Sequence, residues 1–209
     1  MEDWTDFSWG EEKLKANAGD TLNIETRAEK LIVKNESITT VKMKSLKDLC
    51  GLPHEGEQYR IVTYKQFNAY ALIKLLLENR IIEDLHISFY RINKPTADAL
   101  IELIESGKIK RASMIICSYF NQTKKPEKWA EELCDYCKEH PANCNFAYLN
   151  IHAKVVAAKT SNGEMFVFEG SGNMTDNANV EQYVYEQNEK VYNFHCEWMD
   201  ELIRKYEKL

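Results

Sequence analysis

Five side chains between residues 151 and 181 are of the types that can bind and displace a phosphate group. They are His152, Lys154, Ser171, Asn173 and Glu181. Cleavage of a phosphodiester needs a nucleophile, groups that stabilise charge on the phosphate oxygens, and an acid for the leaving group. A neutral imidazole can be the nucleophile, and ammonium, carboxamide and hydroxyl groups can stabilise the oxygens. The segment lacks the cluster of carboxylates that magnesium prefers, so we expect no metal and no other cofactor.

A hairpin is expected to bring these residues together. Asn162-Gly163 favours a tight, two-residue turn between two strands. With that turn, Lys154 lies opposite Ser171, and His152 lies opposite Asn173. Because successive strand residues point to opposite faces, these four side chains are predicted to share one face of the hairpin.

The same alternation assigns the remaining residues of the hairpin. Glu169 is expected on the face of the polar residues. The other face is expected to pack into the core, and it carries Val155, Ala157, Phe166 and Phe168. A longer turn that shifts the pairing by two residues leaves these faces unchanged.

Two short motifs in this segment resemble the HxK…GSxN signature of the phospholipase D superfamily. They are the sequences HAK at 152–154 and GSGN at 170–173. The resemblance implies that His152 attacks phosphorus, while Lys154 and Asn173 bind phosphate oxygens. It also implies a phosphohistidine intermediate and hydrolysis without a metal.

Further residues complete the expected site. Glu181 lies where the superfamily has a glutamate that orients the histidine. Ser171 and the backbone N–H groups of Gly170 and Gly172 are expected to bind substrate, because glycine lets the backbone approach an anion closely. The superfamily often has an aspartate five residues after the lysine, but this chain has Lys159 there, which we expect to add positive charge to the substrate-binding site.

The chain contains one HxK motif, since His54, His86, His140 and His195 all lack a lysine two residues later. In the superfamily, the histidine of a second HxK motif protonates the leaving group. We therefore expect a homodimer in which two His152 side chains face each other across a two-fold axis. This organisation resembles the small, single-motif nucleases of the superfamily, so the expected substrate is nucleic acid or another phosphodiester.

The composition is typical of a soluble globular protein. The chain has 209 residues, of which 44% are hydrophobic and 29% are charged. No apolar run approaches the roughly eighteen residues that a membrane span needs, and the acidic, polar start differs from a signal peptide. These features predict a cytoplasmic protein with no membrane partner. The net charge of −6 disfavours indiscriminate binding to nucleic acid.

Four residues, Cys134, Cys137, His140 and Cys144, have a spacing that a zinc site can have. However, Cys134 and Cys137 fall in a helical pattern, in which a separation of three places them on one face of the helix. We therefore favour buried free thiols, as expected in a reducing compartment, and keep structural zinc as the alternative.

Patterns of strands and helices alternate through most of the chain and predict an α/β fold. Strands are expected at 59–64, 85–90, 112–119 and 145–149, and helices at 67–77, 97–105, 126–139 and 191–209. Together with the resemblance, this order predicts a layered α-β-α sandwich with a mixed, mainly parallel sheet at residues 58–209, a phospholipase D-like domain. Residues 1–57 are expected to form an N-terminal extension with short strands at 21–26, 30–35 and 37–43.

Three single residues have specific structural expectations. Thr96 is a suitable N-cap for the helix at 97–105. His86 and His195 lie on apolar patterns of a strand and a helix, so we expect them to be packing residues rather than ligands.

The leading hypothesis is a dimeric, metal-independent phosphodiesterase of nuclease type. The second is a non-catalytic module on the same fold that binds phosphate or nucleic acid; the acidic composition and the missing aspartate favour it. The third is a phospholipase, which is disfavoured by the single motif and by the lack of a recognisable membrane-binding helix.

Overall fold

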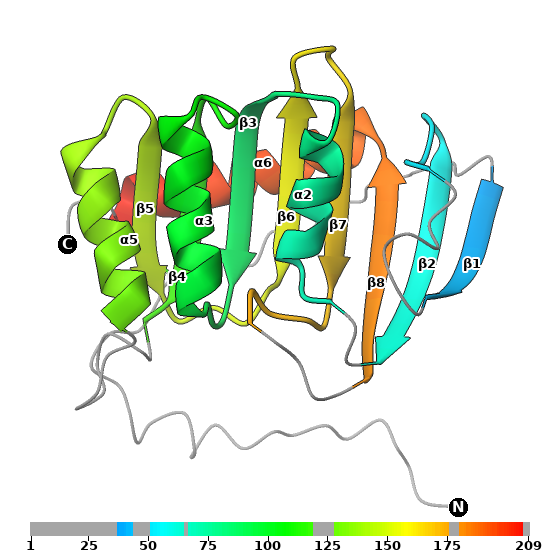
Figure 1. Ribbon diagram of the computed structural model, residues 1–209, viewed down its shortest axis with the longest axis horizontal. Helices are drawn as coiled ribbons and strands as arrows, with labels where there is room; N and C mark the ends of the chain where they lie inside the picture. The colour runs from blue at the N-terminus through cyan, green and yellow to red at the C-terminus, as the bar shows by residue number, and fades with distance from the viewer. Residues whose placement is uncertain (1–36, 44–50, 65–66, 119–127, 176–179, 207–209) are drawn as a thin grey trace, which may run out of the picture. The chain divides into compact units, whose positions relative to one another are not determined.

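The computed structural model describes residues 37–43, 51–64, 67–118, 128–175 and 180–206, all of which lie in one compact unit, Val33–Leu209. These residues form an eight-stranded sheet with the strand order β1-β2-β8-β7-β6-β3-β4-β5 (Figure 1). The strands are β1 Ser37–Met43, β2 Glu57–Tyr64, β3 Ile82–Phe89, β4 Ala112–Cys117, β5 Cys144–Leu149, β6 Val155–Thr160, β7 Met165–Gly170 and β8 Val180–Gln187.

The sheet is mixed, and most of its strands run in one direction. The pairs β1–β2, β3–β4 and β4–β5 are parallel, and the four pairs between β2 and β3 in the strand order are antiparallel. Consequently β6 and β8 run against the other six described strands. The predicted mixed, mainly parallel sheet is confirmed.

Helices cover both faces of the sheet, as Figure 1 shows. The described helices are α2 Tyr70–Leu77, α3 Lys94–Glu105, α5 Lys128–Glu139 and α6 Glu189–Tyr206. The first three pack on one face and share a large apolar cluster with it, whereas α6 packs on the other face with a second cluster. The predicted α-β-α sandwich is therefore confirmed. None of the described helices combines the length and apolar character needed to cross a membrane.

The burial of β4 and the start of α3 both follow from the local sequence. All six residues of β4 are buried, because helices lie over both of its faces. The cap of α3 differs from the prediction: Asn93, and not Thr96, is the N-cap residue, and its side chain accepts a hydrogen bond from the Thr96 backbone N–H at 3.1 Å. Pro95 lies in the first turn, where its missing N–H is not needed.

The strand predictions near the two ends of the chain had different outcomes. The strand expected at 37–43 is confirmed as β1, which pairs with β2 in parallel and belongs to the same sheet. The strands expected at 21–26 and 30–35 lie outside the described residues. No element was predicted at 180–187, where the structure has β8 in the middle of the sheet. The domain boundary near residue 57 stays a prediction.

Candidate active site

The candidate site lies at one edge of the sheet, where three neighbouring strands begin or end. His152 and Lys154 precede β6, whereas Ser171 and Asn173 follow β7. Glu181 is the second residue of β8. Because β6, β7 and β8 are adjacent and antiparallel, their ends place all five residues at the same edge.

The turn between β6 and β7 is one residue longer than predicted. The Thr160 N–H donates to the Glu164 carbonyl oxygen at 2.9 Å, so Ser161, Asn162 and Gly163 form a three-residue turn. Gly163 has a φ of 83°, as the left-handed last residue of such a turn requires. The register is therefore shifted by one residue from the prediction, and such a shift moves side chains to the opposite face.

The shift changes which hairpin side chains share a face. Glu169 pairs with Val155 and lies on the face covered by α6, where its carboxylate is 3.4 Å from His195 Nε2. Glu169 had been predicted to lie with the polar residues of the site, and this prediction was wrong. The prediction of one apolar face was also wrong, because helices cover both faces of the sheet. Val155 and Ala157 pack in the cluster under α6. Phe166 and Phe168 pack in the cluster on the opposite face, which includes α2.

His152 and Lys154 contact each other directly. Lys154 Nζ lies 3.0 Å from Nδ1 and 3.3 Å from Nε2 of His152, and it donates to the His152 carbonyl oxygen at 3.0 Å. A neutral imidazole offers one ring nitrogen as an acceptor, whereas a protonated ring offers none. The hydrogen bond from the ammonium group needs a ring nitrogen without a proton, and attack on phosphorus needs the same kind of nitrogen. His152 is exposed, so a substrate can reach it.

Tyr90, which directly follows β3, connects the residues of the site. Its ring centroid is 4.9 Å from that of His152 and 5.9 Å from Lys154 Nζ. The backbone N–H groups of Tyr90 and Arg91 both donate to Asn173 Oδ1 at 3.2 Å. With its oxygen held in this way, the Asn173 carboxamide can direct its N–H groups toward a ligand. The structure thus brings His152, Lys154 and Asn173 together around Tyr90.

Tyr90 was not predicted from the sequence. A usable signal was its position at the carboxyl end of a strand in an α/β sheet, which is where ligands bind in many such folds. Its distance from the two motifs in the sequence concealed the connection.

Ser171 and Glu181 contact each other. Ser171 Oγ donates to Glu181 Oε2 and accepts from the Gln182 N–H at 3.0 Å. The Glu181 side chain is buried, with 7% of the residue exposed. The resemblance implied that Glu181 orients His152, but no carboxylate of the described part of the chain contacts the His152 ring.

Glu181 acts on Lys154 through its charge. Burial lowers the pKa of Lys154 below the ordinary lysine value, and the negative charge of Glu181 opposes that shift. The buried carboxylate therefore helps to keep the ammonium group charged.

Gly170 is required by the packing of β7 against β8. A Cβ atom at this position would lie 2.2 Å from the Gln182 carbonyl oxygen and 2.5 Å from Cδ1 of Tyr183. Gly170 and Gly172 also line a small recess at the end of the sheet, together with Lys154. The close approach that Gly170 permits is therefore an approach to the neighbouring strand.

Lys159 lies away from the other candidate residues. It lies on the same face of β6 as Val155 and Ala157, which pack under α6. At about 3.3 Å per residue, it is roughly 16 Å along the strand from Lys154. The structure does not bring it to the site, although it was expected to contribute to substrate binding.

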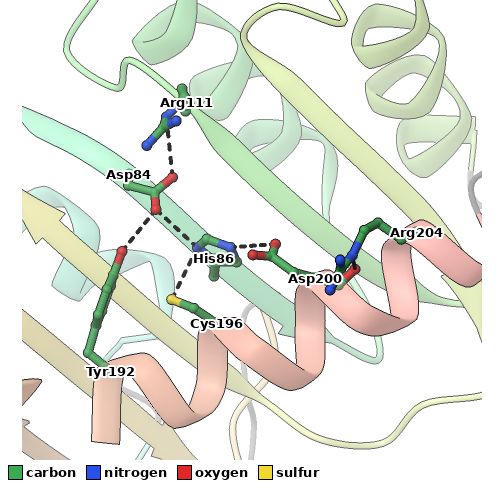
Figure 2. Close-up of polar contacts among 7 residues, drawn as sticks. All are labelled: Asp84, His86, Arg111, Tyr192, Cys196, Asp200 and Arg204. Carbon is green, nitrogen blue, oxygen red and sulfur yellow. Dashed lines mark hydrogen bonds and ion pairs between the residues drawn. The ribbon is translucent and has the colours of Figure 1, made fainter. Parts of the chain in front are cut away.

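Two of the other histidines, His86 of β3 and His195 of α6, are buried between the sheet and α6 with side-chain partners, as predicted. His86 Nε2 lies 2.9 Å from Asp200 Oδ1, and His86 Nδ1 lies 3.4 Å from Cys196 Sγ. Figure 2 shows both contacts as dashed lines. His195 Nδ1 accepts from Trp198 Nε1 at 3.1 Å. Only 3% of His86 and 6% of His195 are exposed.

The cysteines of the suggested zinc motif are buried thiols. Cys134, Cys137 and Cys144 are unpaired and buried. The His140 ring stacks on Tyr136, and its Nδ1 lies 2.9 Å from the Tyr136 carbonyl oxygen. Among the described residues, no group of three or more His, Cys, Asp or Glu side chains is arranged to hold a metal ion.

Comparison with known proteins identifies the fold. No family model matches the chain, and no curated protein sequence matches it. The structure is similar to that of the phospholipase D family member Nuc from Salmonella typhimurium, with a TM-score of 0.50 and 17% identity over 69% of this chain and 93% of Nuc. The fold is phospholipase D-like.

Larger proteins contain the same phospholipase D-like fold. Polyphosphate kinase from Porphyromonas gingivalis matches with a TM-score of 0.50 and 14% identity, over 71% of this chain. The match spans 26% of the kinase, so the chain corresponds to about a quarter of that protein. At these identities the similarity establishes the fold, and it confirms at that level the resemblance drawn from the two motifs.

Proposed function

We propose that this chain is a phosphodiester hydrolase of nuclease type, which works without a metal through a phosphohistidine intermediate. The main support is the convergence of His152, Lys154 and Asn173 around Tyr90 at one edge of the sheet. An exposed imidazole next to a cationic and a carboxamide donor has the composition of a site for in-line attack on phosphate.

In the proposed reaction, the neutral His152 ring attacks phosphorus as the bond to the leaving oxygen breaks. Lys154 transfers its hydrogen bonds from the imidazole to the phosphate oxygens, and the Asn173 N–H groups bind the same oxygens. The negative charge of Glu181 helps to keep Lys154 protonated during this step. Water then hydrolyses the phosphohistidine, which releases the phosphate product and restores the neutral ring.

The leaving group needs an acid, and we propose that a second subunit supplies it. Of the other histidines, His86 and His195 are buried between the sheet and α6, while His54 precedes β2 and His140 follows α5. None of them contacts His152 among the described contacts. A homodimer that places the partner subunit's His152 next to this one completes the site.

The first test is cleavage of bis(p-nitrophenyl) phosphate in the presence of EDTA. His152→Ala is expected to abolish turnover, because it removes the nucleophile. His54→Ala is the matched control, since His54 is an exposed histidine outside the site, and it is expected to keep wild-type activity. Full activity of His152→Ala in EDTA contradicts the proposal.

The second test mixes subunits. If each site uses one His152 from each subunit, a mixed dimer of wild type and His152→Ala is inactive. Random pairing at equal amounts then leaves about a quarter of the dimers active, whereas independent sites leave about half of the activity. The assay is turnover after joint refolding of the two chains, with the dimer confirmed by light scattering.

One observation favours a second candidate function, a non-catalytic module that binds phosphate or nucleic acid. No described carboxylate contacts the His152 ring, since Glu181 is bonded to Ser171. A nucleophilic histidine without such a partner is less well oriented. Binding of a single-stranded oligonucleotide by the wild type, lost in Lys154→Ala and never followed by cleavage, would select this function.

A further inference from the structure

A cleft separates the N-terminal halves of α2 and α3. Both helices begin at the edge of the sheet that carries the candidate site, since α2 follows β2 and α3 follows β3 in the chain (Figure 1). The cleft has a volume of about 310 Å³, and its walls include Phe67, Asn68, Tyr70 and Lys74 on the α2 side and Asn93 and Ala99 on the α3 side. This volume is at the lower end of the roughly 300–1,000 Å³ of small-molecule sites, so the cleft suits a single flat group.

The cleft and the candidate site share a stretch of backbone. The Ala69 N–H donates to the Asn173 carbonyl oxygen at 3.3 Å, and the Asn93 N–H donates to the Met174 carbonyl oxygen at 3.2 Å. The backbone at 173–174 therefore joins the two walls of the cleft beside the Asn173 carboxamide. A group bound in the cleft lies next to the phosphate that this carboxamide is proposed to bind.

The cleft also lies on the same face of the sheet as the recess at Lys154. Lys154 lines that recess together with Ala69, Phe168 and Tyr183. These last three residues belong to the apolar cluster that α2 and α3 share with the sheet. Because Ala69 lies between two residues of the cleft wall in the chain, the recess and the cleft are neighbours.

Aromatic rings give the cleft flat surfaces. The Phe67 ring stacks on that of Tyr183, with centroids 5.8 Å apart and an angle of 20° between the planes, and this contact holds it in place. Burial, together with the charge of Glu102, raises the pKa of Tyr70, so its ring is a neutral phenol at neutral pH. Aromatic surfaces of this kind stack nucleobases with little preference among them.

The polar groups of the cleft are donors and a cation. Asn68 Oδ1 accepts from the Tyr70 N–H, and Asn93 Oδ1 accepts from the Thr96 N–H, both at 3.1 Å. With their oxygens held in this way, both carboxamides offer N–H groups to a ligand, and nucleobases carry ring-nitrogen and carbonyl acceptors. Lys74 is exposed, with Nζ 5.2 Å from the Tyr70 ring centroid, so a positive charge lies beside the aromatic surface.

We propose that this cleft binds a nucleobase, and that the substrate of the proposed hydrolase is single-stranded nucleic acid. The base next to the attacked phosphate stacks on the aromatic walls, the Asn68 and Asn93 carboxamides donate to its acceptors, and Lys74 pairs with a neighbouring phosphate. A base in a duplex is already stacked and paired, and its removal costs free energy, so single strands are favoured. The position of the attacked phosphate in this arrangement rests on the proposed function.

The first test is binding without cleavage, in the full-length protein with His152→Ala. Fluorescence anisotropy compares a short fluorescein-labelled oligothymidylate with an abasic chain of the same length and charge. The abasic chain should bind roughly 5- to 150-fold more weakly, which is the range expected for the loss of one stacked base.

The second test fills the cleft. Ala99→Trp places an indole ring between the walls, so this variant should bind the oligothymidylate as weakly as the abasic chain. Its affinity for an oligothymidylate–oligoadenylate duplex should be unchanged. Ser106→Trp is the matched control, because it adds the same ring at the exposed C-cap of the same helix without a change in charge, and it should keep the affinity of the parent protein.

The third test removes the proposed phosphate contact. Lys74→Ala should weaken the binding of the oligothymidylate and of the abasic chain alike. The slope of log K against log salt concentration should become less steep by about 0.7, the value for one contact with a single strand. Lys190→Ala, which removes an exposed lysine of α6 on the other face of the sheet, is the control and should change neither quantity.

Equal binding of the oligothymidylate and the abasic chain overturns the proposal, as does an Ala99→Trp protein that is folded by thermal unfolding and keeps its preference for bases. A duplex that loses as much affinity in Ala99→Trp as the single strand also overturns it, and so does an equal loss in Ser106→Trp. None of these measurements involves turnover. Failure of the wild type to cleave bis(p-nitrophenyl) phosphate refutes the hydrolase and leaves the base preference of the cleft as measured, so the two failures are distinguishable.

Discussion

Replacement of Gly170 by alanine tests the packing of β7 against β8 beneath the site. The added Cβ would lie 2.2 Å from the Gln182 carbonyl oxygen and 3.0 Å from Cα of Tyr183. Ordinary contacts of a carbon atom are about 3.5 Å, so the two strands must separate locally by roughly 1 Å. Both nearest backbone atoms belong to a central strand and cannot rotate away as the end of a side chain can.

Overpacking of this kind costs about 1–3 kcal/mol in the free energy of unfolding. For a chain of this size, that corresponds to a fall in Tm of roughly 2–12 °C. The loss should also reach the site, because the Ser171 N–H donates to the same Gln182 oxygen at 3.0 Å and Ser171 Oγ holds Glu181. We therefore expect Gly170→Ala to lose both stability and phosphodiesterase activity.

Gly163→Ala is the matched control, measured with Gly170→Ala by urea unfolding and by turnover of the model substrate. Gly163 lies in the turn at the other end of the hairpin, and a Cβ there meets no atom within 4 Å. Its left-handed backbone still makes alanine unfavourable by about 1–2 kcal/mol, but the site should be unaffected. A Gly170→Ala protein that unfolds within about 0.5 kcal/mol of wild type refutes the close approach of the two strands.

Three further predictions concern charges and hydrogen bonds. The Arg80 guanidinium, 2.5 Å from Glu164 with both side chains about a quarter exposed, holds the pKa of Glu164 below its usual value. The pair therefore stabilises the protein above the unfolded pKa of about 4.3, and this stabilisation is lost as pH falls through the lower folded pKa. Glu164→Gln should lower the free energy of unfolding by about 0.5–1 kcal/mol at pH 7. In urea unfolding, the difference from wild type should vanish near pH 2.5. Glu181→Gln should lower the pKa of Lys154 further, measured by NMR titration of the lysine side chain, and a rise contradicts the assigned charge effect. Asn173→Ala should lower the free energy of unfolding by about 1–3 kcal/mol because two backbone N–H groups lose their acceptor, whereas Asn173→Asp keeps that acceptor and should be the more stable variant while still losing substrate affinity.

The sequence was sufficient for the elements whose hydrophobic pattern agrees with their burial. The apolar run of β4 and the three-to-four-residue repeat of α6 identify a central strand and a packed helix without further information. β8 was missed because its buried positions include Glu181 and Glu186, so that polar and apolar residues do not separate onto two faces.

The register of the hairpin could not be decided from Asn162-Gly163. A glycine with a positive φ suits both a two-residue and a three-residue turn, and the choice depends on the hydrogen bond between Thr160 and Glu164. A difference of one residue was enough to move Glu169 to the opposite face and into contact with His195.

The candidate site was accessible from the sequence where its residues are close together in the chain. The two motifs were found by their spacing, and in the structure His152 contacts Lys154 while Asn173 contacts the backbone of Tyr90. Contacts that depend on strand order were not accessible, since β3 and β6 are neighbours only in the folded sheet. This is why Tyr90 was missed.

The hairpin tip at Ser161–Gly163 offers a practical attachment point. The tip and the candidate site lie at opposite ends of β6 and β7, and its three residues are exposed. A fluorophore or short affinity tag inserted there would leave the edge that carries the candidate site free. Immobilisation through the tip would orient every molecule with that edge toward the solution, as single-molecule measurements of cleavage and binding require.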